Sequence, residues 1–349
     1  MLKLEDKLKV QPLLAPEFPN KATSILNGDV SGILSWNDIR NDATYERYKE
    51  LLSRFWTPFE INMSDDAKQW KQFTEQQKET FLKINGLVAI LDSVQPRFFS
   101  LLIKYISDTA VQAKLIIAMQ QEVIHNHSYS YIMSSIEQLT RQNLAFEMAR
   151  TEKPIYERNK LITEVYENLE KNPTVQSFVE ALVASMALEG INFYSAFAYF
   201  YNLARNQKML KTSSIISYIN IDELVHTKVV GDILNDLIND NPRLFEHVEK
   251  FSYYLFKQAV EKEIEWSEYI LKNEEDIDMY EMKEYIKYRA NKCLSIIGIK
   301  PLYEDVDDNP MPWIRSFSEE NIDMGKSDFF EQKSRQYTKV SDSNGFDDL

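Results

Sequence analysis

Periodic runs of apolar and polar residues fill most of the chain, and their spacing predicts helices. Apolar residues recur in these runs with the repeat of one helix face. Asn-Pro pairs and Ser, Thr or Asp residues separate the runs, and the chain of 349 residues has only eight glycines. The pattern predicts an all-α protein, with helices at about 44–56, 75–106, 110–136, 174–206, 213–239, 243–272 and 278–299.

Three less regular segments suggest how the chain is divided. Residues 1–30 are mixed in character and contain prolines, so we expect an N-terminal arm. The more charged segment 143–171 is predicted to form a crossover helix or helix pair on the outside of a bundle. Residues 327–349 are polar and are predicted to form a flexible C-terminal tail. The helical domain would then span 31–326.

Composition narrows the classes of partner and compartment. The net charge of −14 argues against a nucleic-acid partner. Cys293 is the only cysteine, so no disulfide framework can form, which fits a reducing cytoplasm. We recognise no signal peptide. The apolar run 181–203 approaches the length of a membrane span, but it contains Glu189 and Asn192, so we expect a buried core helix and no membrane.

Candidate chemistry is concentrated in the stretch EVIHNHSY, residues 122–129. Glu122 and His125 are three residues apart and share a helix face, and Tyr129 returns to that face two turns later. The stretch DELVH repeats the same spacing with Glu223 and His226. One Glu-x-x-His pair is weak evidence, because most such pairs on helices are solvated or make local hydrogen bonds.

An acid in an apolar helix precedes each pair and strengthens the case. Asp92 lies 30 residues before Glu122, and Glu189 lies 34 residues before Glu223. A buried, unpaired carboxylate costs on the order of several kcal/mol, so four of them together need compensation. Two divalent metal ions would supply it, in the arrangement known from di-metal carboxylate helical bundles. The alternative is a set of polar core residues that satisfy one another.

The chain resembles the small, radical-generating subunit of class I ribonucleotide reductase. The resemblance runs from about Trp56 to Trp313, and it rests on LDSVQPR (91–97), EVIHNHSY (122–129), LEGINFYSAF (188–197), DELVH (222–226) and NPMPWI (309–314). It implies a ferritin-like helical bundle with additional helices and a di-metal site in its core. It also implies a homodimer and a large catalytic subunit that reduces ribonucleotides.

The resemblance implies a role for each matching residue. Tyr129 would hold a stable radical after the metal centre has activated oxygen. An apolar pocket around the radical would include Phe193, Phe197 and Ile219. The metal ligands would be Asp92, Glu122, His125, Glu189, Glu223 and His226.

Transfer of the oxidising equivalent would use further residues. Trp56 and Asp222, with His125, match the family's relay from the cofactor, and Tyr337 in the tail matches the tyrosine that passes the radical to the large subunit. The tail itself would dock to that subunit. The family commonly has Arg before the second Asp-Glu, where this chain has Ile221, which leaves the hydrogen bonding around Asp222 open.

Metal identity and subclass stay open at this point. We expect two Fe ions per chain, with Mn2 or Mn/Fe as alternatives, and an activating redox protein is a further candidate partner. A variant that keeps the oxidising equivalent on the metals is also open. A fatty acyl desaturase or other di-iron oxidase would share the six ligands but would not need Tyr129, Trp56 or the tail. Iron storage would need no tail, and a helical scaffold would not bury four carboxylates.

Overall fold

The computed structural model describes residues 2–306 and 308–317, and this part of the chain is helical without a strand. The prediction of an all-α fold is confirmed. The helices are α1 Asp42–Leu52, α2 Ser64–Trp70, α3 Glu75–Tyr105, α4 Thr109–Ile136, α5 Leu139–Thr151, α6 Lys153–Lys171, α7 Val175–Ala187, α8 Tyr194–Arg205, α9 Leu210–Asp240, α10 Phe245–Leu271 and α11 Met279–Ile296. Shorter turns of helix are η1 Pro58–Glu60, η2 Leu188–Asn192, η3 Pro242–Leu244 and η4 Pro312–Ser316.

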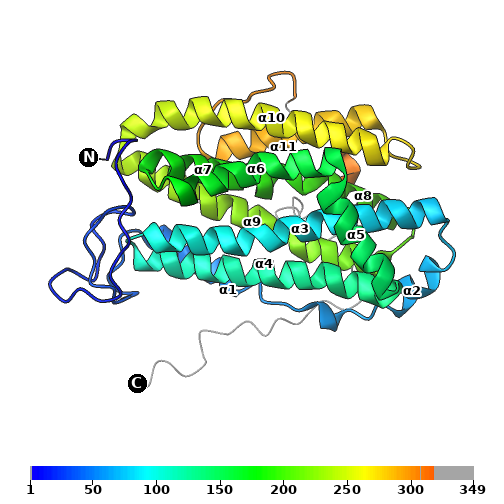
Figure 1. Cartoon of the computed structure of the whole chain (residues 1–349), viewed down its shortest axis with the longest axis horizontal. Helices are drawn as coiled ribbons and strands as arrows, with labels where there is room; N and C mark the ends of the chain where they lie inside the picture. Colours follow the sequence, from blue (N-terminus) through cyan, green and yellow to red (C-terminus); the bar gives the residue numbers. More distant parts are fainter. Residues whose placement is uncertain (1, 307, 318–349) are drawn as a thin grey trace.

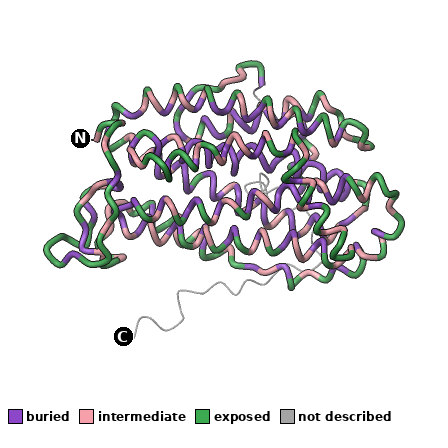
Figure 2. The backbone as a smooth tube through the Cα atoms, in the orientation of Figure 1, coloured by how far each residue is buried: buried purple, intermediate pink, exposed green. Residues whose placement is uncertain are grey.

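Two long helices, α3 and α4, pack side by side along one side of the bundle (Figure 1). The helix α9 packs against both α4 and α7, while α6, α10 and α11 complete the other side. The buried positions line the inner faces of these helices (Figure 2). This arrangement directs side chains of α3, α4, α7 to α8, and α9 toward one core.

The predicted helix 174–206 corresponds to one helical stretch, Val175–Arg205, which contains a π-helical turn that the pattern did not predict. The chain forms α7, then the π-helix η2, then α8, so Glu189 lies in a π-helical turn. Single π-helical turns occur often at functional sites. The helix α3 also has an irregular position, because Pro96 has no N–H to donate to the carbonyl of Asp92 four residues earlier. Both acid-bearing helices are therefore irregular near the acid.

Two helical stretches are long and apolar enough to cross a membrane, Glu75–Tyr105 and Val175–Arg205. The most apolar window of Val175–Arg205 is completely buried inside the protein, as the sequence predicted for a core helix. This burial explains its composition, because every face of the segment contacts other helices.

The N-terminal segment contains no helix before α1 in its described residues, and it packs against one end of the bundle (Figure 1). Ile25 and Leu26 are completely buried, and Leu26 forms an isolated bridge with Ile106. A second bridge joins Lys7 to Thr174. The division into arm, helical domain and tail stays a prediction, and the tail lies outside the described residues.

Candidate metal centre

The two Glu-x-x-His units meet in the core. Glu122 and His125 of α4 and Glu223 and His226 of α9 place their ligand atoms within 4.8 Å of one another. All four side chains are completely buried. The helical repeat that puts each pair on one face, together with the packing of α4 on α9, produces this cluster.

Each glutamate of the cluster faces both histidines. For Glu122, Oε1 lies 2.7 Å from Nδ1 of His226, and Oε2 lies 3.8 Å from Nδ1 of His125. For Glu223, Oε1 lies 2.9 Å from Nδ1 of His125, and Oε2 lies 3.2 Å from Nδ1 of His226. Each carboxylate thus directs one oxygen toward each histidine.

The outer nitrogen of each histidine has a fixed partner. Nε2 of His125 lies 3.1 Å from Oδ2 of Asp222, and Nε2 of His226 lies 3.0 Å from Oε1 of Gln121. An oxygen acceptor requires the proton on Nε2, so the lone pair of Nδ1 points into the cluster. Metal-binding histidines are oriented by such outer hydrogen bonds.

The other two predicted acids, Asp92 and Glu189, flank this cluster. Both are buried on α3 and η2, but neither belongs to the compact group of four. Burial, followed by the charges of Glu122 and Glu223, raises the pKa of both carboxyl groups well above the ordinary range. Asp92 and Glu189 are therefore further buried carboxyl groups beside the cluster that could hold a cation.

The unsatisfied atoms of the site fit divalent metals. Buried carboxylate oxygens without a hydrogen-bond partner include both oxygens of Asp92 and Oε2 of Glu189. The oxygens of Glu122 and Glu223 face the Nδ1 atoms of the two histidines. Burial lowers the pKa of His226, but the negative charge of Glu122 outweighs this effect and raises the pKa to about 9. The carboxylates therefore favour positive charge at this site. Buried acceptors without donors are costly, and cations would satisfy them.

Tyr129 lies in a dry part of the same core. Its side chain is completely buried, and burial together with the charge of Asp92 raises the pKa of the phenol well above its ordinary value. Phe193 and Phe197 are buried and stack on each other with ring centroids 5.7 Å apart, and Ile219 is buried as well. The phenol is therefore neutral and shielded from solvent.

The structure connects Trp56 to the cluster through Asp222. Nε1 of Trp56 donates to Oδ2 of Asp222 over 2.8 Å, and the same oxygen lies 3.1 Å from Nε2 of His125. The indole and imidazole rings stack with centroids 5.9 Å apart. These contacts form with Ile221 at the position where the family commonly has Arg.

Sequence reasoning missed the residues around the ligands. Gln121 partners His226, and Nε2 of Gln95 donates to Oε1 of Glu189. The hydroxyl of Tyr166 donates to Oε1 of Gln95 over 2.9 Å and fixes the orientation of its amide. Gln95 follows Asp92 by three residues and so shares its helix face, which was the available signal. Tyr337 lies outside the described residues.

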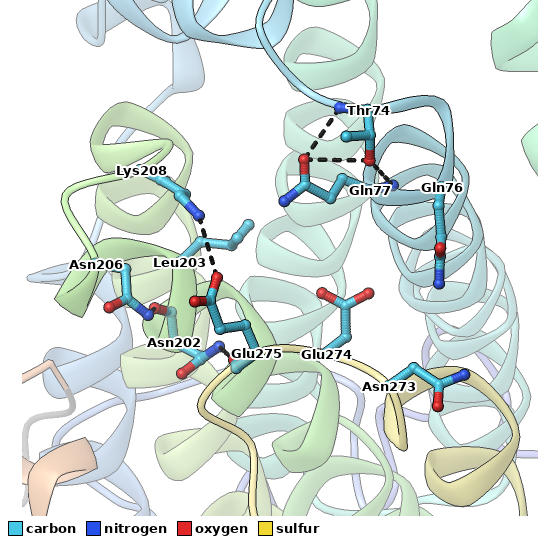
Figure 3. Close-up of a pocket in the computed structure, with 10 residues that line it drawn as sticks. All are labelled: Thr74, Gln76, Gln77, Asn202, Leu203, Asn206, Lys208, Asn273, Glu274 and Glu275. Atoms are coloured by element: carbon cyan, nitrogen blue, oxygen red, sulfur yellow. Dashed lines mark hydrogen bonds and ion pairs between the residues drawn. The ribbon is translucent and has the colours of Figure 1, made fainter.

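A polar surface hollow shares no residue with the buried cluster (Figure 3). Thr74 and Gln77 at the start of α3 line it on one side, with Asn202 and Glu275 opposite. The side chains of Thr74 and Gln77 form the capping box of α3. Helix capping accounts for these two polar groups.

Known proteins resemble this chain over most of its length. The family described as ribonucleotide reductase, small chain, matches residues 33–310. A curated ribonucleoside-diphosphate reductase subunit beta of Halalkalibacterium halodurans is 45% identical over 346 residues, 99% of this chain and 100% of the relative. The solved ribonucleotide reductase R2 subunit of Clostridium botulinum has a TM-score of 0.86 and 35% identity, and the match covers 89% of this chain and 99% of that one.

A more distant structure shares the fold alone. The dimanganese(II)-NrdF of Streptococcus sanguinis is 24% identical, has a TM-score of 0.73, and covers 82% of this chain and 98% of its own.

Proposed function

Because the chain belongs to the ribonucleotide reductase small-chain family, we propose that it generates and stores the radical used for ribonucleoside-diphosphate reduction. The observation that carries this proposal is the buried cluster of two Glu-x-x-His units, one from α4 and one from α9. A di-metal site needs this doubled donor set, whereas a satisfied polar core would leave fewer orphaned oxygens.

Six residues would hold two ions. Glu122 and Glu223 would be shared between them, since each glutamate directs one oxygen toward each histidine. His125 and His226 would bind through Nδ1, and Asp92 and Glu189 would complete the two outer sides. When bound, iron or manganese in such a site supplies oxygen activation and one-electron oxidising power.

Tyr129 would store the radical. The raised pKa keeps its phenol protonated at neutral pH, so loss of an electron must be accompanied by loss of the hydroxyl proton. Asp92, whose carboxyl group would be ionised once it holds a metal ion, is our proposed proton acceptor. Complete burial keeps water and reductants away from the ring, and the pocket of Phe193, Phe197 and Ile219 would contribute to this exclusion.

Trp56, Asp222 and His125 would connect the site to the outside. Oδ2 of Asp222 holds the indole N–H and faces the imidazole, so an electron and a proton can move along one set of contacts. Tyr337 would continue this path to the large subunit. One cysteine cannot supply a redox dithiol, so the reduction itself would take place on the large subunit.

Iron and manganese are both compatible with the donor set. Carboxylate and imidazole ligands suit either metal, and metal supply and an activating partner contribute to the choice. We propose two Fe ions per chain, with Mn2 or Mn/Fe as alternatives. A redox protein would be the activating partner in the manganese case, and the cytoplasm is our prediction for the location.

A homodimer is part of the proposal, and an exposed apolar face supports it. Ile116 and Val123 are seven residues apart on α4 and are 47% and 56% exposed, and Leu52 of the neighbouring α1 is 46% exposed. A second copy could cover this face. Sedimentation velocity should show a dimer that Val123→Asp weakens, and a wild-type monomer at micromolar concentration would contradict it.

Metal analysis tests the ligand assignment. Wild-type protein should bind two ions per chain, and Glu189→Ala should lose at least one ion and its ability to support ribonucleotide reduction, while its helical content persists. A Glu189→Ala protein that binds two ions as tightly as wild type would show that the ligand set is wrong.

A further inference from the structure

Two buried arginines donate hydrogen bonds to backbone carbonyls of the π-helical turn η2. Nε of Arg289, on α11, donates to the carbonyl of Gly190 over 3.2 Å. Nη2 of Arg158, on α6, donates to the carbonyl of Asn192. These carbonyls belong to residues one and three positions after Glu189. Neither α6 nor α11 carries a predicted ligand, yet each binds the backbone next to the predicted ligand Glu189.

Arg158 is itself fixed on three sides. Nε donates to Oε2 of Glu263 over 2.5 Å, and Nη1 donates to Oδ1 of Asn159 over 2.8 Å. The other oxygen of Glu263 accepts the hydroxyl of Ser195, at the start of α8 just after η2. One buried ion pair thus binds the chain at the end of η2 and again at Ser195.

The helix α11 supports η2 by a second kind of contact. The guanidinium of Arg289 lies 3.5 Å from the ring centroid of Tyr194, the first residue of α8. A Cβ at Gly190 would lie 2.1 Å from Sγ of Cys293, one turn after Arg289, so the glycine permits a close approach of α11. Position 190 therefore combines a small residue with a bound carbonyl.

Stability alone is a poor explanation for this arrangement. Arg158 and Glu263 are 1% and 0% exposed, and a buried ion pair often stabilises a protein no more than apolar residues of the same volume. What the planar guanidinium provides is several donors in fixed directions, which a lysine cannot reproduce. Here those donors point at the backbone beside Glu189.

We propose that Arg158 and Arg289 are positioning residues that hold the π-helical turn so that Glu189 can reach its metal ion. The proposal rests on the proposed role of Glu189 as a ligand. Without either arginine, the released carbonyl would lose its donor, and the turn would shift or fluctuate. The affinity for the ion on the Glu189 side should then fall, while the other ion is bound as before.

Titration of the metal-free protein with Mn(II) alone tests this. Free Mn(II) is measured by electron paramagnetic resonance, so no enzyme activity is needed. Arg158→Lys and Arg289→Lys keep the charge but not the fork of donors, and each should weaken one of two sites by about 10- to 100-fold. The matched control is Arg205→Lys, because Arg205 donates to the carbonyl of Asp276 and not to η2. It should bind both ions like wild type.

Hydrogen exchange provides a second measurement on the same proteins. Amides of residues 189–194 should exchange faster in both variants, with the amides of α1, which packs on α4 and α9, unchanged. If Arg158→Lys fails to fold, the same measurements on Arg289→Lys, whose arginine lies on the other helix, test the proposal. The proposal is overturned if folded variants bind two ions with wild-type affinity, or if they lose thermal stability with unchanged metal binding and uniform exchange.

Glu189→Ala separates this inference from the proposed function. If Glu189→Ala loses a site and the arginine variants keep both, only the positioning role fails. If Glu189→Ala itself keeps two tight sites, the ligand assignment fails, and the positioning role fails with it.

Discussion

Each imidazole of the site directs Nδ1 toward the two glutamates and Nε2 toward a fixed partner. The sequence predicted His125 and His226 because the spacing Glu-x-x-His places both groups on one helix face. It could not predict Gln121 as the partner of His226, since that contact depends on how α4 packs against α9. Family resemblance, and not spacing, led to the assignment of Asp222.

Asp222 should matter for metal binding through His125. In Asp222→Asn the amide loses the negative charge that supports the imidazole, and one of its two terminal atoms can no longer accept. We expect the metal affinity to fall about 10- to 100-fold, measured by competition with a fluorescent chelator. Asp236→Asn is the control, because Asp236 lies on the same helix but accepts from Asn41. Equal affinities in both variants would contradict this role.

Cys293 should be chemically inert in the folded protein. Burial raises the pKa of its thiol to about 12, so at pH 8 only about one thiol in ten thousand is the reactive thiolate. Iodoacetamide at pH 8 should leave Cys293 unmodified by mass spectrometry, while protein unfolded in guanidinium should react. Rapid modification of the native protein would show that the thiol is accessible.

The raised pKa of Cys293 predicts that the protein loses stability as the pH rises above the ordinary pKa of a thiol. The unfolded thiol ionises near its ordinary pKa of about 8.5, whereas the folded thiol stays neutral up to about 12. The contribution of this group to folding is present below the lower value and is lost as the pH rises to the higher one. Cys293→Ala should remove this part of the pH dependence.

Among the elements, the two that carry the outer acids depart from regular helix. The apolar pattern predicted the helical character and the burial of 174–206, but not the π-helical turn at Glu189. Hydrophobic periodicity does not reveal one extra residue in a turn. Gly190 was the available signal, because a glycine inside an apolar helix indicates close packing.

Gly190→Ala should destabilise the protein by crowding. Its Cβ would lie 2.1 Å from Sγ of Cys293, and overpacking of a core costs about 1–3 kcal/mol. Chemical denaturation should show a lower midpoint for this variant. The double variant Gly190→Ala/Cys293→Ala should recover part of the loss, because the clashing sulfur is removed. A Gly190→Ala variant as stable as wild type would mean that η2 shifts at little cost in free energy to make room for the methyl group.

At the scale of the whole molecule, one cluster collects residues from helices far apart in the sequence. The doubled order of acid and Glu-x-x-His predicted four ligand-bearing helices. The bundle brings α4 and α9 together at the cluster, whereas the ligand role of the buried Asp92 and Glu189 stays a prediction. Nothing in the sequence pattern indicated the buried arginines of α6 and α11. Arg158 lies in the charged segment 143–171, which was predicted to form a crossover on the outside of the bundle. Such contacts depend on tertiary packing.

The C-terminal tail should serve two functions with different residues. The segment 343–349 joins Phe346 and Leu349 to acidic groups in the sequence, and we propose that it docks to the large subunit. Deleting 343–349 should weaken association, measured by surface plasmon resonance, and leave metal binding intact. Tyr337→Phe should keep association but stop nucleotide reduction. Full-strength binding of the truncated chain would place docking elsewhere, and wild-type turnover by Tyr337→Phe would remove Tyr337 from the path.

The central claim is that the six ligands hold two metals beside Tyr129 and that this tyrosine stores the radical. Electron paramagnetic resonance of metal-loaded, oxygen-activated protein tests it most directly, in wild type and in Tyr129→Phe with equal metal content. The account predicts a tyrosyl radical in wild type and none in Tyr129→Phe, with two ions per chain in both. An active wild-type protein that shows only metal-centred spin would contradict it.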